Sequence, residues 1–380
     1  MSRKILVVGQ LPPPVHGSTV MGERFMRALK NNGFETKIVQ KTFSKKNEEV
    51  GKASLLKLMR VPGHCYRLLK TIRRFKPNLC IYFVTVGITA LAVDALLIEL
   101  LIRCRIPYVL YFHGKGYRKY ALGSGKLKRF VVRKTLQRAA GGIVLGEGLK
   151  PDVSGYIPNE RLFVLPNGIP DITIDVKEEH RNDGIVHVIF MSNLHQTKGP
   201  MEFLEMAKIV VDNTEQVRFT IAGSVVDEEF YKRLLNYKES EGLADYVEIP
   251  GPLFGKEKEA LFMSADIFVF PTYKDTFPLV NLEAMQCGIP VISSNEGAIP
   301  DVIRDGVNGY IVDPKNVGQI AARVLELIQN PLLREVMGKA GRNLYKKHYS
   351  MDAYERNVKM AVNHFLSKTS GSDLSAGVEG

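Results

Sequence analysis

Residues 267–293 read IFVFPTYKDTFPLVNLEAMQCGIPVIS. This stretch decides the fold because it contains a complete strand–loop–helix–strand unit. An apolar strand is predicted over Ile267–Phe270, and Pro271 breaks it into a short polar loop. A helix follows, and a second apolar strand is predicted over Pro290–Ser293. Strands that alternate with helices in this way are typical of a parallel α/β sheet.

Two carboxylates lie eight residues apart in this stretch. Asp275 stands in the loop before the helix, and Glu283 stands within its first turns. Carboxylates accept hydrogen bonds from paired hydroxyls, and a helix N-terminus holds phosphate on its free N–H groups. The pattern predicts a site for a molecule with hydroxyls at each end and a diphosphate between them, which describes a nucleotide-sugar.

The string DTFPLVNLEAMQCGIPVI, residues 275–292, resembles the donor-site signature of the family 4 retaining glycosyltransferases. The resemblance implies the GT-B fold, in which two Rossmann-like, doubly wound α/β domains face a central cleft. It also implies transfer of a sugar with retention at the anomeric carbon. The family usually has Glu where this chain has Asp275, which keeps the charge but is one methylene shorter.

The domain organisation follows from the length and the alternation of elements. A chain of 380 residues favours two domains. We expect an N-terminal acceptor-binding domain over 1–170, a linker over 171–184 and a C-terminal nucleotide-sugar donor domain over 185–345. The resemblance implies that a helix over 346–366 crosses back to the first domain, and residues 367–380 read as a disordered tail.

Two loops of the first half are candidates for the site. The loop after the first strand contains Gly17, the only match to two adjacent glycines with which the family approaches the donor diphosphate. The pattern G-x-G-x-x-G is absent, so an NAD-binding interpretation loses its main support. His113, followed by Gly114, ends a predicted strand. In the family the matching histidine contacts the donor sugar, and the resemblance assigns that role to His113.

Two loops of the second half complete the predicted donor site. Residues 192–199 resemble the family pattern G-R-L-x-x-x-K-G, in which the Arg and the Lys neutralise the diphosphate. Lys198 matches, whereas Asn193 stands where the Arg is expected. Leaving-group stabilisation is then expected from Lys198 and from the helix N-terminus near residues 277–280. Gly251 lies where the family's loop meets the nucleobase.

The resemblance therefore implies a set of site residues. Glu283 would accept the ribose hydroxyls, Asp275 would hold sugar hydroxyls, and Lys198 would offset charge on the departing diphosphate. The predicted catalytic residues are His113, Lys198 and Asp275. The predicted donor-binding residues are Gly17, Asn193, Lys198, Gly251, Asp275, Phe277, Leu279, Val280 and Glu283. We expect no metal, because no D-x-D triplet occurs, and no cofactor beyond the nucleotide-sugar as co-substrate.

The charge is unevenly distributed. Residues 1–172 contain 30 Lys and Arg against 10 Asp and Glu, and the remainder contains 22 against 30. Apolar residues alternate with the basic ones at helical spacing, which is typical of a surface that binds an anionic membrane. Two basic clusters dominate, and they comprise Lys57, Arg60, Arg67, Lys70, Arg73, Arg74 and Lys76, then Lys115, Arg118, Lys119, Lys126, Lys128, Arg129, Arg133, Lys134 and Arg138.

The composition sets the expected compartment and partners. Four scattered cysteines without C-x-x-C spacing suit a reducing cytosol, and the N-terminus does not resemble a signal peptide. We expect a cytoplasmic protein bound peripherally to the inner face of the membrane. The expected donor is a UDP-sugar, and the expected acceptor is a lipid-linked glycan. No nucleic-acid partner is expected, because no nucleic-acid module is readable and Trp is absent.

Two alternatives stay open at this stage. A nucleotide-sugar epimerase can share the two-domain fold, and it would consume the donor without adding an acceptor. A non-catalytic, basic membrane- or nucleic-acid-binding module is the other alternative, and it would not be stabilised by any nucleotide-sugar.

Overall fold

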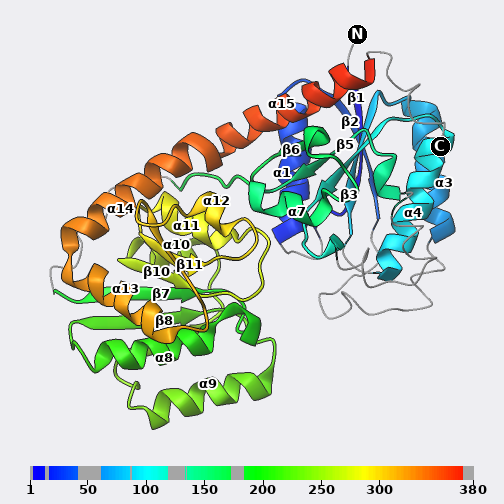
Figure 1. Ribbon diagram of the computed structural model, residues 1–380. Helices are drawn as coiled ribbons and strands as arrows, with labels where there is room; N and C mark the ends of the chain where they lie inside the picture. The colour runs from blue at the N-terminus through cyan, green and yellow to red at the C-terminus, as the bar shows by residue number, and fades with distance from the viewer. Residues whose placement is uncertain are drawn as a thin grey trace. The chain divides into compact units, whose positions relative to one another are not determined.

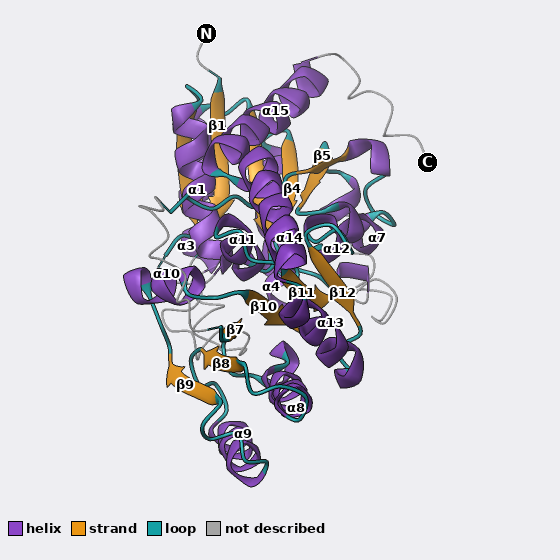
Figure 2. Cartoon of the chain, turned by 90° about the vertical axis from the view of Figure 1, so that its left-hand side faces the viewer, coloured by secondary structure: helices purple, strands orange, loops and turns teal. Residues whose placement is uncertain are grey.

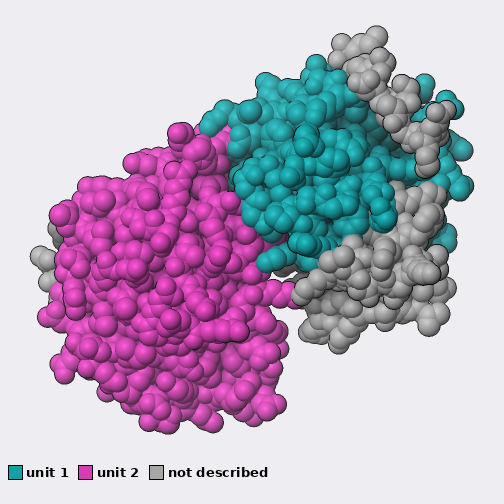
Figure 3. All heavy atoms as spheres, viewed as in Figure 1, with its two compact units in different colours: residues 1–167, 354–380 teal, residues 168–353 magenta. Residues whose placement is uncertain are grey.

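The computed structural model describes residues 3–12, 17–41, 61–85, 88–118, 133, 135–172 and 184–370. The chain forms two compact units (Figure 3). Unit 1 contains residues 1–167 and 354–380, and unit 2 contains residues 168–353. The chain therefore passes from one unit to the other twice, after residue 167 and within its last helix.

Unit 1 is built on a six-stranded parallel sheet with the strand order β2-β1-β3-β4-β5-β6. Every residue of β3 and β4 is buried, as expected for parallel strands that helices cover on both faces. The strands are β1 (Lys4–Gly9), β2 (Glu35–Gln40), β3 (Leu79–Val84), β4 (Tyr108–Phe112), β5 (Gly141–Val144) and β6 (Leu162–Val164).

Helices lie on both sides of this sheet (Figure 1). The described helices are α1 (Gly17–Asn31), α3 (Val61–Phe75), α4 (Ile88–Arg103), α7 (Lys150–Val153) and most of α15 (Met351–Ser370). Helices α3 and α4 pack together on one side, and α1 lies on the other. The last helix is fixed within unit 1 by hydrogen bonds, since Asn31 donates to the Glu355 carboxylate at 2.8 Å.

A buried ion pair joins the ends of two strands to α4. Lys41 Nζ lies 2.7 Å from Asp94 Oδ1, and the two side chains are 2% and 0% exposed. Tyr82 donates its hydroxyl proton to Asp94 Oδ1 at 2.7 Å, and the Thr85 N–H donates to Asp94 Oδ2 at 2.8 Å. Lys41 also donates to Thr85 Oγ1. Because both oxygens of the Asp94 carboxylate accept hydrogen bonds and the Lys41 ammonium donates them, the two charges are stabilised within the core.

Unit 2 contains a second six-stranded parallel sheet with the order β12-β11-β10-β7-β8-β9. The central strands β10, β7 and β11 are buried throughout. The strands are β7 (Val186–Met191), β8 (Val217–Ala222), β9 (Val247–Gly251), β10 (Ile267–Phe270), β11 (Val291–Ser294) and β12 (Gly309–Val312).

Helices also cover both faces of the second sheet (Figures 1 and 2). Helices α8 and α13 pack against each other, and α11 packs against α14. The helices are α8 (Pro200–Val211), α9 (Glu228–Ser240), α10 (Gly255–Met263), α11 (Leu279–Gln286), α12 (Ile299–Val302), α13 (Val317–Gln329) and α14 (Pro331–Leu344). A π-helical turn, Tyr345–Tyr349, leads from α14 into α15.

The predicted fold class is confirmed, because both units are parallel, doubly wound α/β sheets. Strand Ile267–Phe270 has the predicted bounds. Helix α14 and the π-helical turn were not predicted. The alternation of elements also predicts helices over 53–75 and 127–138, and the N-terminal part of the first and most of the second lie outside the described residues. Most of the predicted linker and the end of the predicted tail lie outside them as well. No helix within the described ranges is long and apolar enough to cross a membrane.

The buried ion pair predicts a large difference between two carboxylates of α4. Asp94→Ala strands the Lys41 ammonium in the core and should lower the free energy of unfolding by about 3–5 kcal/mol. Glu99→Ala is the matched control on the same helix, since Glu99 pairs with the exposed Arg103, and it should cost less than about 1 kcal/mol. Chemical denaturation measures both variants. Equal losses of unfolding free energy in the two variants would show that the buried pair contributes no more to stability than the exposed one.

Candidate functional site

Two loops of unit 2 are joined at the carboxyl edge of the sheet, where β7 and β10 are neighbours. The Thr197 carbonyl accepts hydrogen bonds from the Tyr273 N–H at 2.9 Å and from Thr272 Oγ1 at 3.1 Å. Gly199 has a φ of 83°, and a Cβ added there would lie 2.3 Å from the Pro271 carbonyl oxygen. Only glycine therefore fits at this position, because both its backbone conformation and the space around it exclude a side chain.

This junction brings Lys198 to Asp275. Lys198 Nζ lies 2.7 Å from Asp275 Oδ2 and donates to the Lys274 carbonyl at 2.9 Å. The Thr276 N–H donates to Asp275 Oδ1 at 2.8 Å. The two charged side chains are 24% and 19% exposed. The ion pair is held on both sides by backbone and still remains accessible to a ligand from solvent.

A third loop, after β11, closes the other side of the Asp275 loop. The Ala298 N–H donates to the Thr276 carbonyl at 2.9 Å. A Cβ on Gly297 would lie 2.5 Å from the carbonyl oxygens of both Asp275 and Thr276. The backbone around Asp275 is thus fixed by two neighbouring loops, which makes it a rigid platform.

Helix α11 begins directly after this platform and carries the second carboxylate. Pro278 is its N-cap, and Phe277 is buried just before it. Leu279 and Val280 form the first turn, where backbone N–H groups lack helical partners. Glu283 lies one turn further and pairs with Lys258 of α10, whose Nζ is 2.7 Å from Glu283 Oε1.

The β8 and β9 loops form the far edge of this region. The Gly223 N–H donates to the Gly251 carbonyl at 2.9 Å, and Gly251 has a φ of 87°. The Leu194 N–H donates to the Ser224 carbonyl at 2.8 Å. Asn193, directly before Leu194, is exposed. Gly251 ends β9, and Asn193 lies in the loop after β7. Both residues therefore lie at the same carboxyl edge of the sheet as Lys198.

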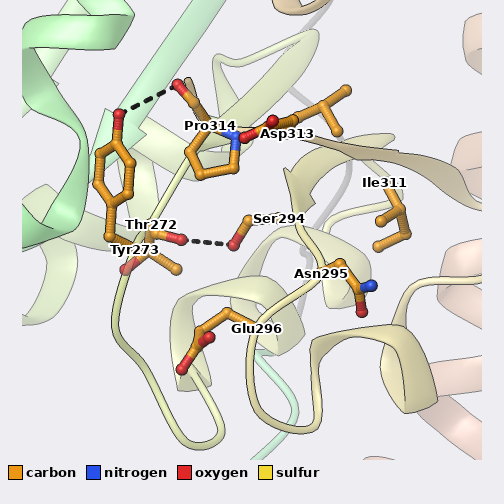
Figure 4. A pocket seen from close by; sticks show the side chains of 9 residues that line it. Thr272, Tyr273, Ser294, Asn295, Glu296, Ile311, Asp313 and Pro314 are labelled. Atoms are coloured by element: carbon orange, nitrogen blue, oxygen red, sulfur yellow. Dashed lines mark hydrogen bonds between the residues drawn. The ribbon is translucent and has the colours of Figure 1, made fainter. Parts of the chain in front are cut away.

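A cavity of about 450 Å³ adjoins the Asp275 loop at the ends of β10, β11 and β12 (Figure 4). Tyr273 donates to the Pro314 carbonyl at 3.3 Å, and Ser294 donates to the Thr272 carbonyl at 2.5 Å. These bonds fix its walls. The lining residues are Thr272, Tyr273, Ser294, Asn295, Glu296, Ile311, Val312, Asp313 and Pro314.

The other two predicted site residues belong to unit 1. His113 follows β4, and its ring is stacked on Phe83 with a centroid distance of 5.0 Å and lies 4.1 Å from the Tyr111 ring. His113 Nε2 is buried and has no hydrogen-bond partner among the described residues. Burial lowers the pKa of His113 to about 3, so the ring is neutral at pH 7. Gly17 opens α1, and a Cβ there would meet no atom of the described residues within 4 Å.

The structure thus groups the predicted residues of unit 2 and describes His113 and Gly17 within unit 1. Lys198 and Asp275 are in direct contact. Lys258 was not predicted. It lies 25 residues before its partner Glu283, on a different helix, and no spacing pattern links the two in the sequence. A search for lysines on the helix before β10 could have identified Lys258 as a candidate, but it would not have indicated the contact with Glu283.

Comparison with known proteins adds the following similarities. The family profile "Glycosyl transferases group 1" matches residues 171–344. A glycosyltransferase of Methanocaldococcus jannaschii, described as uncharacterized, is 30% identical over 66% of this chain and 67% of its own length. The D-inositol 3-phosphate glycosyltransferase of Paenarthrobacter aurescens is 30% identical over 49% of this chain and 45% of its own length. This chain thus spans about half the length of that relative.

Solved structures show the same fold. The Anabaena protein HepE, in complex with UDP, has a TM-score of 0.74 and 16% identity over 95% of this chain and 100% of its own. At this identity the likeness shows the fold, which is GT-B, as expected from the sequence.

The loop junction generates a prediction about stability. Gly199→Ala combines a strained φ with a collision against the Pro271 carbonyl, and it should lower the free energy of unfolding by roughly 2 kcal/mol or more. Gly242→Ala is the matched control, because Gly242 also has a positive φ, 69°, but open space around its Cβ position. The control should cost about 1 kcal/mol. Denaturation of both variants checks this, and a Gly199→Ala loss no larger than the control would contradict the proposed packing.

Proposed function

Because this chain belongs to the group 1 glycosyl transferases, family 4, we propose that it is a retaining glycosyltransferase that takes its sugar from a nucleotide-sugar. The observation that carries the proposal is the arrangement around α11. Asp275, paired with Lys198, lies in the loop that leads into α11. The N-terminus of α11 presents backbone N–H groups without helical partners, and Glu283 lies in the second turn of this helix. These are the groups that a sugar, a diphosphate and a ribose require.

Each residue has a chemical role in this proposal. Glu283 accepts hydrogen bonds from the ribose hydroxyls, and Asp275 accepts them from the sugar. Lys198 offsets the negative charge that builds on the departing diphosphate, together with the N–H groups of Leu279 and Val280. Asn193 contributes a neutral contact, and Gly251 leaves room for the nucleobase. The backbone that carries the short Asp275 side chain is held in place by contacts with two neighbouring loops.

His113 is proposed to contact the donor sugar as a neutral ring. Burial lowers its pKa, which favours the neutral ring near pH 7, and its buried Nε2 lacks a partner among the described residues. A neutral imidazole either donates or accepts one hydrogen bond, which suits a sugar hydroxyl. Gly17 is proposed to allow the diphosphate to approach the start of α1, because glycine itself places no side chain there.

The donor is proposed to be a UDP-sugar carrying a hexose or an N-acetylhexosamine. Support comes from the solved relative HepE, which was crystallised with UDP. Transfer is proposed to need no metal, with the acceptor attacking the face that the diphosphate leaves. The acceptor hydroxyl then passes its proton to the departing phosphate, and the anomeric configuration is retained.

The acceptor is proposed to be a lipid-linked glycan of cell-surface polysaccharide or glycoconjugate assembly, reached at the inner face of the membrane. Helix α3 supports this. It contains no acidic residue, and its basic side chains Arg67, Lys70, Arg73 and Arg74 are all exposed. Such a face fits an anionic lipid surface, where each basic side chain contributes about 1 kcal/mol. Many basic residues of the second cluster lie outside the described residues.

A panel of UDP-, GDP- and ADP-sugars tests the donor proposal, with EDTA present. One donor at ten times its dissociation constant should stabilise the wild type by about 1.4 kcal/mol. Glu283→Ala should lose this response, because the ribose hydroxyls lose their acceptor. Thermal unfolding and donor hydrolysis provide the two measurements.

Glu335→Ala, an exposed carboxylate on α14, is the matched control and should keep the full response. No stabilisation of the wild type by any member of the panel would contradict the proposed function. Donor converted to a free epimer, with no acceptor modified, would replace it by an epimerase.

A further inference from the structure

The proposed donor raises an electrostatic problem at Glu283. A nucleoside diphosphate carries two or three negative charges, and the ribose lies next to the α-phosphate in the same molecule. An unpaired carboxylate that binds the ribose would therefore repel the phosphates of its own ligand. In water this repulsion is weak, but Glu283 is only 20% exposed, and partial burial strengthens it.

We infer that Lys258 is a positioning residue that neutralises Glu283, so that this carboxylate accepts the ribose hydroxyls without repelling the diphosphate. This inference rests on the proposed function, and it names a residue that the sequence pattern of the family does not supply.

The geometry of the contact supports this role. Lys258 Nζ lies 2.7 Å from both carboxylate oxygens of Glu283. The ammonium donates a hydrogen bond to Oε1, whereas Oε2 lies within ion-pair distance but is buried and accepts no hydrogen bond from the described residues. Both side chains are partly buried, with exposed fractions of 27% for Lys258 and 20% for Glu283. An ion pair in this setting is screened less than one on the open surface.

The rest of the site does not supply this charge. Lys198 is already paired with Asp275 at 2.7 Å. The charges of the two ion pairs therefore sum to zero, and the N-terminus of α11 adds a partial positive charge. Removal of Lys258 alone leaves a net charge of −1 next to the ribose. Among the described residues, Lys258 is the only cationic side chain that forms an ion pair with Glu283.

The lysine also has a matched neighbour. Lys256 stands on the same helix, α10, and is exposed. Substitution of Lys256 removes the same charge from the protein and from the same helix, without touching Glu283. A difference between the two positions therefore reports the contact rather than the net charge.

The experiment measures the dissociation constants of three probes by titration calorimetry: UDP, UMP and uridine. If the donor panel selects another base, the corresponding nucleotides replace them. The proteins are wild type, Lys258→Met, Lys258→Arg, Lys256→Met and the double variant Lys258→Met/Glu283→Gln. Methionine keeps the length of the lysine side chain and removes its charge.

Lys258→Met should weaken UDP binding by about 10-fold and uridine binding by less than about 2-fold, with UMP between them. Lys258→Arg should stay close to wild type, as should Lys256→Met. In the double variant the stranded charge is gone, so the ratio of the UDP to the uridine constant should return to the wild-type ratio. This holds even though a neutral amide accepts the ribose hydroxyls less well than the Glu283 carboxylate does.

Equal weakening of UDP and uridine by Lys258→Met would overturn the inference, because it would show that the lysine only holds Glu283 in place. No weakening of UDP would overturn it as well. These outcomes are distinct from failure of the proposed function, in which wild type itself binds none of the nucleotides.

Discussion

The candidate site depends on one backbone contact, the approach of Gly199 to the carbonyl of Pro271. A Cβ at position 199 would lie 2.3 Å from that oxygen, so the loops after β7 and β10 can touch only because position 199 has no side chain. Once they touch, the Thr197 carbonyl binds the backbone of the β10 loop at Tyr273. Lys198, which lies between Thr197 and Gly199, is thereby directed to Asp275. The ion pair is a consequence of the packed backbone.

Ion pairs serve two different purposes in this chain. The Lys41–Asp94 pair is buried and surrounded by hydrogen bonds, and a ligand cannot reach it. The Lys198–Asp275 and Lys258–Glu283 pairs have the same contact distance, but their side chains are 19–27% exposed. A ligand can reach a partly exposed pair while the pair stays intact, whereas the buried pair is closed to ligands. Exposure, more than distance, separates the structural pair from the two that are suited to binding.

The sequence predicted much of unit 2 because its signals are local. Ile267–Phe270 is a short apolar run followed directly by Pro271. A strand of this kind can be predicted from its own residues, without knowledge of the strands that pair with it. The positions of Asp275 and Glu283 relative to α11 follow from the same stretch. The Lys258–Glu283 contact could not be predicted, because it depends on how α10 packs beside α11. The π-helical turn at Tyr345–Tyr349 was not predicted either, because residue types alone do not distinguish an i→i+5 turn from an α-helical one.

The central claim is that α11 and the loops before it hold a nucleotide-sugar, with Glu283 at the ribose and Lys198 at the diphosphate. A crystal structure of the protein with bound UDP, or with the nucleotide selected by the donor panel, tests this most directly. The account predicts ribose hydroxyls at about 2.7 Å from the Glu283 carboxylate and phosphate oxygens beside Lys198 and the N-terminus of α11. A nucleotide bound elsewhere, with the ion pairs of Lys198 and Lys258 unchanged and no contact to Glu283, would contradict it.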